Sequence, residues 1–405
     1  MKKEKTFYFR QDIRKLDISS QKAMYLLFKH AEKIYNEALY LSRQYYDKEG
    51  KYCGYVYMID RLSESQNFKI LGNKISVSII RNLDINYKNY FKSIAAKKYC
   101  NAPGYRNANT SFFISIFSVG ITNNDYITIP LTVEFRTKYG FEDRFFLKIE
   151  VAKRFLSIGI RTIKQVRVQR DTKKGLYYLV YHYTQEVEQA KKIPGRALGI
   201  DFGGTNLLSC YSNKEGSRPF IIKGGHVKYI NHQAFKRLNK DMQRSNFELS
   251  QKMIDRMTKR SNKIDKYYDR IAKYITLYCM KNGIENVYVG AFLGIKNQER
   301  ALNRTFVRIP YLRLRLKLKD KLNAVGIEIY FIDESYTSKT SFIDEETPFK
   351  HSEYEGKRKK RGLFCSKDGK LINADINGAA QILIKGGGKV SNRKNVLISP
   401  KILKH

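Results

Sequence analysis

Apolar residues recur at helical spacing in two stretches near the N-terminus. Residues 18–48 place them on one stripe between lysines and arginines, and residues 76–93 form a second stripe. Both stretches are therefore predicted to be helices of one unit, with helical structure over about 18–95. The segment CNAPGYRNANT that follows is predicted to be a loop, because Pro103, Gly104 and the asparagines interrupt any period.

The pattern changes after residue 111 to short β-branched and aromatic runs separated by turn residues. The runs are FFISIF, YITIPLTVEF, FFLKIEV, FLSIGI, VRVQR and GLYYLVYHYT. Several strands at such short spacing predict a small barrel or sandwich. Two arrangements stay open: the helices are inserted into the barrel, so that residues 1–190 form one composite region, or a plain β-domain follows a helical one.

A polar linker, QEVEQAKKIPG, precedes a second domain that is predicted over residues 196–385. Three apolar runs come first, then a long basic helical stretch over about 231–282, a strand, a helix over about 311–325, a strand, a loop and the helix DINGAAQILIK. This order predicts an α/β domain whose sheet mixes antiparallel and parallel pairs. Residues 386–405 begin glycine-rich and basic, and are predicted to be a flexible tail.

Charge changes this picture more than any other property. The 405 residues include 77 Lys and Arg against 38 Asp and Glu, so the net charge is 77 − 38 = +39. A charge this high attracts polyanions, which makes nucleic acid the expected partner. With 42% hydrophobic and 13% aromatic residues the chain can bury real cores, which excludes wholesale disorder.

The expected compartment is the cytoplasm, with nucleoid association in a prokaryote and no membrane partner. The N-terminus MKKEKTFYFRQD lacks an apolar segment behind its basic residues, and no run approaches the roughly 18 apolar residues of a membrane span. The five cysteines contain no CxxC pair. They are expected to be free thiols, not disulfides or an intact zinc site.

Two aspartates lie where a metal or phosphate site can form. Asp201 follows the apolar run ALGI and precedes FGGTN, and a carboxylate at a buried strand tip beside glycines is typical of such sites. Asp375 begins the last predicted helix, where the helix dipole also favours an acid for structural reasons alone. The two could share a hard cation through carboxylate oxygens, and a third acid would complete a two-metal site.

Three motifs taken together are more specific. GIDFGGTN, YTSKTS and NADINGAA, with a basic helical stretch after the first, resemble the RuvC nuclease domain of TnpB, the transposon-encoded RNA-guided nuclease related to type V CRISPR effectors. YNEALY and PGYR resemble its N-terminal half, so the resemblance covers nearly the whole chain. It implies an α/β plus α+β fold, with a C-terminal RuvC/RNase H-like domain behind an N-terminal wedge β-barrel with a helical recognition insert.

The resemblance also implies which residues act. It assigns catalysis and the binding of two Mg²⁺ ions, for which Mn²⁺ could substitute, to Asp201 and Asp375. Gly290 stands where most of the family have a glutamate, and a glycine ligates no metal. Either Glu334 supplies the carboxylate after the next strand, as in a branch of the family that shares both features, with Asp333 as the fallback; or the site is inactive. We favour Glu334, because decay gives no reason for an acid to remain there.

The family commonly has a four-cysteine zinc finger, here within residues 338–372. The matching positions look like Ser341, Asp344, Cys365 and Asp368. One thiolate, a serine and two carboxylates are a poor tetrahedral set, so no zinc is expected.

Two basic segments are expected to contact nucleic acid, with a solvated surface as the alternative. In relatives the helical one cradles the heteroduplex of guide and target. The residues are Lys236, Arg237, Lys240, Arg244, Lys252, Arg256, Lys259 and Arg260 in the helical stretch, and Lys357, Arg358, Lys359, Lys360 and Arg361 in the loop.

These observations predict a Mg²⁺-dependent RNA-guided DNA endonuclease that cuts double-stranded DNA next to a short duplex motif by two-metal hydrolysis. Guide RNA and target DNA are the expected partners of a monomer, with a dimer as the alternative. The runner-up is a guide-dependent DNA-binding protein without cleavage, because of Gly290. A remote third reading is an actin-like ATPase or sugar kinase, because DFGGTN also suits nucleotide phosphates.

Overall fold

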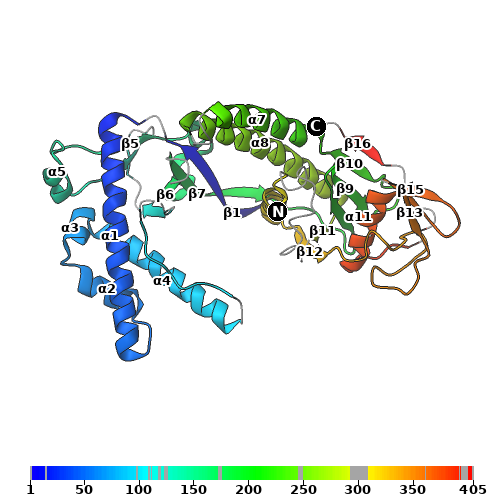
Figure 1. Ribbon diagram of the computed structural model, residues 1–405, viewed down its shortest axis with the longest axis horizontal. Coiled ribbons are helices and arrows are strands. Elements are labelled where there is room, and N and C mark those ends of the chain that lie inside the picture. Colours follow the sequence, from blue (N-terminus) through cyan, green and yellow to red (C-terminus); the bar gives the residue numbers. More distant parts are fainter. Residues whose placement is uncertain are drawn as a thin grey trace. The chain divides into compact units, whose positions relative to one another are not determined.

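The computed structural model describes residues 2–13, 16–96, 99–107, 110, 112–116, 120–122, 126–171, 176–244, 250–291, 309–360, 362–391, 393 and 400–403. The chain divides into two compact units (Figure 1). One is Glu4–Glu186, and the other is Val187–His405 together with Met1–Lys3. No helix within the described ranges is long and apolar enough to cross a membrane.

The first unit begins its helical part with a long amphipathic helix. Asp17 caps this helix, because its side chain accepts a hydrogen bond from the Ser20 amide at 2.8 Å. One face buries Leu27, Phe28 and Ile34, as the apolar spacing predicted. The helices are α1 (Ile18–Glu49), α2 (Gly54–Leu62), α3 (Gln66–Leu71) and α4 (Asn73–Ala95).

The strands of this unit form two sheets. In one the order is β1-β7-β6-β2, and in the other it is β3-β4-β5. The pairings of the described strands show no closed barrel, so the barrel stays a prediction. The strands are β1 (Lys2–Asp12), β2 (Phe112–Ile116), β3 (Gly120–Thr122), β4 (Tyr126–Ile129), β5 (Leu147–Glu150), β6 (Ile163–Asp171) and β7 (Leu176–Glu188).

Two runs that the pattern assigned to strands are helical. FLSIGI lies mostly in α6 (Lys153–Ile158), and the end of YITIPLTVEF lies in α5 (Val133–Tyr139). Thr132 starts α5 by accepting the Phe135 amide at 3.0 Å, and Gly140 ends it in the left-handed conformation. Short apolar runs suit either structure, and here the caps decide.

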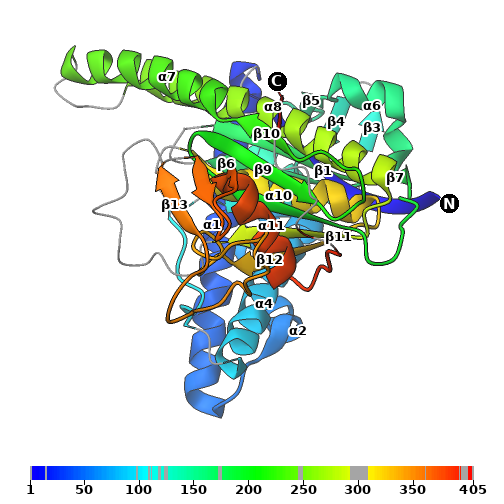
Figure 2. The same ribbon diagram turned by 90° about the vertical axis from the view of Figure 1, so that its right-hand side faces the viewer.

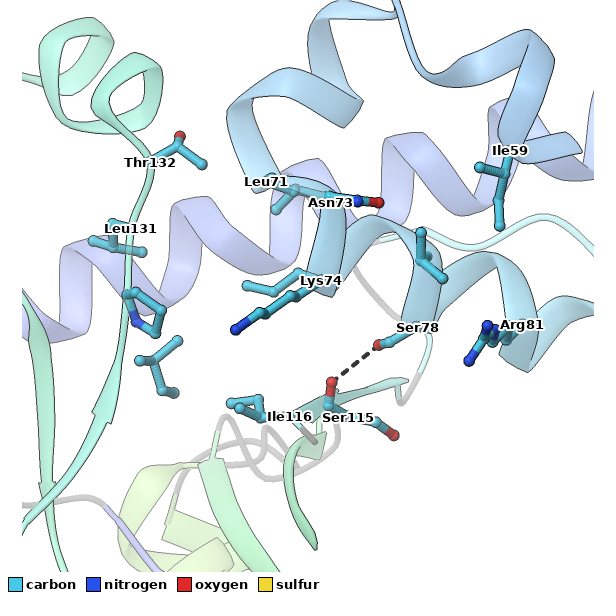
Figure 3. A pocket seen from close by; sticks show the side chains of 15 residues that line it. Ile59, Leu71, Asn73, Lys74, Ser78, Arg81, Ser115, Ile116, Leu131 and Thr132 are labelled. Atoms are coloured by element: carbon cyan, nitrogen blue, oxygen red, sulfur yellow. Dashed lines mark hydrogen bonds between the residues drawn. The ribbon is translucent and has the colours of Figure 1, made fainter. Parts of the chain in front are cut away.

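A cavity of about 690 Å³ opens inside the first unit (Figure 3). The start of α4 and the segment between β4 and α5 form most of its walls, which are largely apolar and carry two basic side chains, Lys74 and Arg81. Ser78 crosses to the sheet, donating a hydrogen bond to the Ser115 carbonyl at 3.0 Å. No motif in the sequence indicated this hollow.

The second unit is built on one mixed sheet, as the sequence predicted. Its order is β12-β11-β8-β9-β10-β16. The pairs β8–β11 and β11–β12 are parallel, whereas β8–β9 and β9–β10 are antiparallel. The strands are β8 (Ala197–Phe202), β9 (Asn206–Ser212), β10 (Phe220–Lys223), β11 (Asn286–Ala291), β12 (Glu328–Asp333) and β16 (Lys401–Leu403).

The last strand, β16, lies within residues 386–405, which were predicted to be a flexible tail. β16 pairs in parallel with β10, with Phe220 opposite Lys401 and Ile222 opposite Leu403. Without β16 the backbone groups along one side of β10 would be left unpaired at a sheet edge. Residues 401–403 are therefore part of the sheet.

Helices cover both faces of this sheet. On one face α8 (Gln251–Asn282), α10 (Tyr311–Ala324) and the start of α7 (Gly225–Arg244) enclose an apolar core that includes Leu198, Ile200 and Leu208. On the other face α11 (Ala374–Lys385) packs on β8, β9 and β11 (Figure 2).

Contact between α11 and the sheet depends on the absence of a side chain at Gly199. A Cβ there would lie 2.1 Å from the Ala379 carbonyl oxygen and 2.8 Å from the Leu383 Cβ. Both obstacles belong to the body of the helix, so neither can rotate away. Gly199 thus lets α11 lie directly on β8.

Gly199→Ala should therefore lower the free energy of unfolding by about 1–3 kcal/mol, as overpacking of a filled core does. Thermal or urea unfolding measures the change. Gly225→Ala is the matched control, since a Cβ at Gly225 meets nothing within 4 Å. Equal stability of the two variants would show that α11 does not need this close approach.

Candidate active site

Asp201 lies on the face of the sheet that α11 covers. Side chains alternate along β8, so Gly199 and Asp201 face α11 while Ile200 and Phe202 enter the core beneath α8 and α10. The Asp201 carboxylate touches the helix closely, since a Cβ on Gly378 would be 3.2 Å from Asp201 Oδ2. The first predicted acid is thus held between a strand end and a helix.

Asp375 comes from the first turn of α11. The helix is capped by Asn373, whose side chain accepts the amides of Asp375 at 3.0 Å and Ile376 at 3.1 Å. Asn206, at the start of β9, donates its Nδ2 to Asp375 Oδ2 at 2.5 Å. A strand and a helix cap together fix this carboxylate beside the sheet end.

Glu334 directly follows β12 and lies against Gly290. A Cβ on Gly290 would lie 2.3 Å from Glu334 Oε1 and 2.8 Å from its Cδ and Cγ. The glutamate side chain therefore occupies the space that a side chain at position 290 would need. Gly290 follows Val289, which pairs with Ile200 on β8, so this space adjoins Asp201.

The charges of the other two acids act on Asp201. Burial, and next the charges of Glu334 and Asp375, raise the pKa of Asp201 well above its usual value, while Arg358 opposes the shift. Burial also raises the pKa of Glu334 to about 7, against the influence of Arg315. In both acids the effect of burial outweighs that of the nearby arginine.

The donor set fits a hard divalent cation. Carboxylate oxygens are the ligands that Mg²⁺ prefers, and Glu334 Oε1 is buried with no hydrogen-bond partner among the described residues. In the same part of the chain, no three His, Cys, Asp or Glu side chains are already gathered closely enough to hold a metal ion. The ligand set of Asp201, Glu334 and Asp375 therefore stays a proposal.

Asp333, the fallback ligand, is engaged elsewhere. Lys385 Nζ lies 3.3 Å from Asp333 Oδ2, and Ser335 donates its hydroxyl to Oδ1 at 3.0 Å. About half of the Asp333 side chain is exposed, and no interaction with Asp201 is among the causes of its pKa shift. The structure thus favours Glu334 as the third acid.

Two family models match the part of the chain that supplies these acids. The model described as "Probable transposase" matches residues 180–296, which include Asp201. The model described as "Cas12f1-like, TNB domain" matches residues 311–382, which include Glu334 and Asp375. A curated relative, "TnpB-like protein ORF457" of Acidianus two-tailed virus, is 27% identical over 125 residues. The resemblance to TnpB is confirmed.

The TnpB-like match is limited in length, since it covers 31% of this chain and a quarter (25%) of the viral protein. Among solved structures, "Cryo-EM structure of the Cas12f1-sgRNA-target DNA complex" matches with TM-score 0.59 and 19% identity, over 90% of this chain and 82% of that one. A second, "Cryo-EM structure of CRISPR-Cas12f Ternary Complex", has TM-score 0.35 and 20% identity, over 90% and 81%. The first establishes a shared fold.

Hydrogen bonds organise the segment where TnpB relatives commonly have zinc. The buried Glu346 carboxylate accepts the Ser341 amide through Oε2 at 2.5 Å and the Glu355 amide through Oε1 at 2.8 Å. Asp344 Oδ2 accepts the Lys367 amide at 3.0 Å, and the Cys365 thiol contacts the Ser366 carbonyl. Carboxylates thus tie together distant parts of this segment.

The same segment is joined to α11, the helix that provides Asp375. Asn377 accepts the Phe342 amide at 2.9 Å and donates to the Thr340 carbonyl at 2.8 Å. Gln381 donates to the Glu346 carbonyl at 3.1 Å. A small sheet of β13 (Lys357–Lys360), β14 (Leu363–Cys365) and β15 (Leu371–Asn373) then leads into the helix.

The helices α7 and α8 lie side by side (Figure 1). Four of the predicted basic residues, Arg237, Arg256, Lys259 and Arg260, line a groove between them. The groove measures about 430 Å³ and is lined by Arg237, Lys259 and Lys263 among others. Two predicted contacts also have structural partners: Arg256 pairs with Asp241, and Arg260 Nε donates to Asn231 Oδ1 at 2.7 Å.

Of the residues that the structure describes, the others that were predicted to contact nucleic acid do not line this groove. Lys236, Lys240 and Lys252 are exposed on the two helices. Lys357, Arg358, Lys359 and Lys360 are exposed on β13, and Arg358 is close enough to lower the pKa of Asp201. The side chain of Arg244 and the whole of Arg361 lie outside the described residues.

Three residues near the acids were not identified from the sequence. Asn206 holds Asp375, Tyr311 packs edge-on against Phe202 at 5.9 Å between ring centroids, and Arg315 donates to the Gly290 carbonyl at 3.1 Å. Tyr311 and Arg315 are four residues apart on α10 and so share a helix face. This spacing was the only signal in the sequence for Tyr311 and Arg315, but it does not say which face of α10 meets the sheet.

Glu346→Ala should destabilise the protein by about 1–3 kcal/mol, because two backbone amides lose their buried acceptor. Thermal unfolding with and without added zinc measures this, and zinc should not restore stability. Glu353→Ala, which removes an exposed acid from the same segment, is the matched control. Stoichiometric zinc in the purified wild-type protein, or full stability of Glu346→Ala, would contradict this account of the segment.

Proposed function

We propose that this protein is an RNA-guided DNA endonuclease that hydrolyses phosphodiester bonds with Asp201, Glu334 and Asp375. The observation that supports it most directly is the packing of Glu334 against Gly290. The Glu334 side chain fills the space that a side chain at position 290 would need, and this space adjoins Asp201. An inactive site would have no need for a glycine opposite a carboxylate whose Oε1 is buried with no hydrogen-bond partner among the described residues. The nuclease reading is therefore favoured over a protein that only binds.

The carboxylates of the three acids would hold two Mg²⁺ ions. When bound, the ions supply an activated water and stabilise the leaving oxygen. The chain's own residues do the positioning: Asn206 and the α11 cap hold the Asp375 carboxylate, and the packing of α11 on Gly199 sets its distance from the strand end. Arg358, near Asp201, would attract the phosphate backbone of the strand to be cut.

Guide RNA and double-stranded target DNA are the proposed partners. The net charge of +39 and the cationic groove between α7 and α8 support polyanion binding. The fold shared with a structure whose title names an sgRNA and a target DNA supports the choice of partners. Residues 1–190, with a wedge barrel and helical insert, would read the duplex motif beside the target, and residues 196–385 would cleave.

Glu334→Ala should abolish Mg²⁺-dependent cleavage of a guide-matched target while leaving guide-directed target binding unchanged. Gly290→Ala should also reduce cleavage, because the added methyl displaces the flexible end of Glu334 at little cost in stability. Plasmid cleavage and a filter-binding assay measure the two properties.

The control is Glu328→Ala, which removes an exposed acid at the other end of β12. Asp333→Ala should also cleave. Normal cleavage by Glu334→Ala, or loss only in Asp333→Ala, would reassign the third acid.

Replacing Arg237, Lys259 and Lys263 together by Ala should weaken nucleic-acid binding and reduce the dependence of log K on log salt by about one unit per lost phosphate contact. Binding at several salt concentrations measures the slope. A control with the same loss of charge replaces Lys281, Lys319 and Lys350, which are exposed outside the groove. Equal slopes for the two triple variants would show that the groove is not a binding surface.

A further inference from the structure

Arg315 is placed unusually for an arginine of a basic surface. It lies on α10, half-buried, with its guanidinium carbon 5.3 Å from the centre of the Phe202 ring. Its Nη2 donates to the carbonyl of Gly290 at 3.1 Å. The side chain therefore reaches from the helix to the end of β11, next to the proposed acids.

Arg315 and Glu334, which carry opposite charges, each have a buried atom without a hydrogen-bond partner among the described residues. These atoms are Arg315 Nε and Glu334 Oε1. The two groups attract each other electrostatically, and Glu334 is the only acid among the described residues that shifts the pKa of Arg315. A desolvated guanidinium of this kind needs a nearby anion to offset its burial.

The arginine is also tied to the residue that makes room for Glu334. The Gly290 carbonyl accepts a hydrogen bond from Arg315. The space where a side chain at position 290 would lie holds the Glu334 carboxylate. Glu334 follows β12 and is not part of β11, so the backbone of β11 does not fix where its carboxylate points. Its orientation must come from surrounding groups.

We propose that Arg315 is a positioning residue that holds the Glu334 carboxylate over Gly290 and directs it toward Asp201. Resting on the proposed function, this adds a residue from α10 to the site: the guanidinium is fixed by the Gly290 carbonyl and the Phe202 ring, and its charge orients the glutamate. Groups that orient metal-binding side chains typically affect metal affinity or activity by about 10–100-fold.

The test compares Arg315→Ala, Arg315→Lys and Arg315→Gln with Arg313→Ala. Arg313 lies two residues away on α10, is about half exposed and contacts Ser261 and Asp265. Each full-length protein is loaded with guide RNA. The measurements are target binding, the single-turnover cleavage rate, the Mg²⁺ concentration for half-maximal rate, and the rise in melting temperature that Mg²⁺ causes without target DNA.

Arg315→Ala should bind target normally, cleave about 10–100-fold more slowly, need more Mg²⁺, and lose most of the Mg²⁺-induced rise in melting temperature. Arg315→Lys keeps the charge and should recover part of each loss. Arg315→Gln keeps a donor for the Gly290 carbonyl without the charge and should recover little. Arg313→Ala should match the wild type.

Three results would overturn the proposal: wild-type rate and Mg²⁺ response in Arg315→Ala, equal recovery by the Lys and Gln variants, or equal losses in Arg313→Ala. If Arg315→Ala does not fold, the difference between the Lys and Gln variants decides. Glu334→Ala separates this inference from the proposed function. If Glu334→Ala is inactive and Arg315→Ala is normal, only the role of Arg315 fails; if both cleave normally, the assignment of the third acid fails first.

Discussion

The direct contact between α11 and β8 is the constraint on which the candidate site depends. A helix normally stands off a sheet by the depth of the side chains between them, and Gly199 removes that layer at one position. The helix N-terminus is thereby lowered to the level of the strand end. Asp201 on the strand and Asp375 on the helix then interact across a short gap.

The second feature of the site is an exchange of side-chain space between neighbouring strands. On parallel strands, a position on β11 and the residue after β12 can deliver a carboxylate to the same place if only one of them has a side chain there. Gly290 and Glu334 meet this condition, because a Cβ on the glycine would overlap the glutamate. The absence of a side chain at Gly290 on β11 is thus what gives the Glu334 carboxylate room beside it.

Buried hydrogen bonds organise the segment between Glu334 and Asp375. Glu346 accepts amides from two turns of the segment, and Asn377 and Gln381 join the same segment to α11. Each bond is weak by itself, but the acceptors are buried, so losing one leaves a polar group unsatisfied. This network also supports the helix that holds Asp375, which links the loop to the site.

The sequence by itself determined the long helices, the mixed sheet and the positions of Asp201 and Asp375, because apolar period and strand-end motifs are local properties. It also favoured Glu334 as the third acid, with Asp333 next to it as the fallback. The difference between the two lies in the tertiary structure: Asp333 is paired with Lys385, whereas Glu334 is packed over Gly290, and this supports the proposal of Glu334. The helices α5 and α6, strand β16 and the place of Arg315 were also beyond the sequence. Capping, edge pairing and helix orientation each depend on a partner far away in the chain.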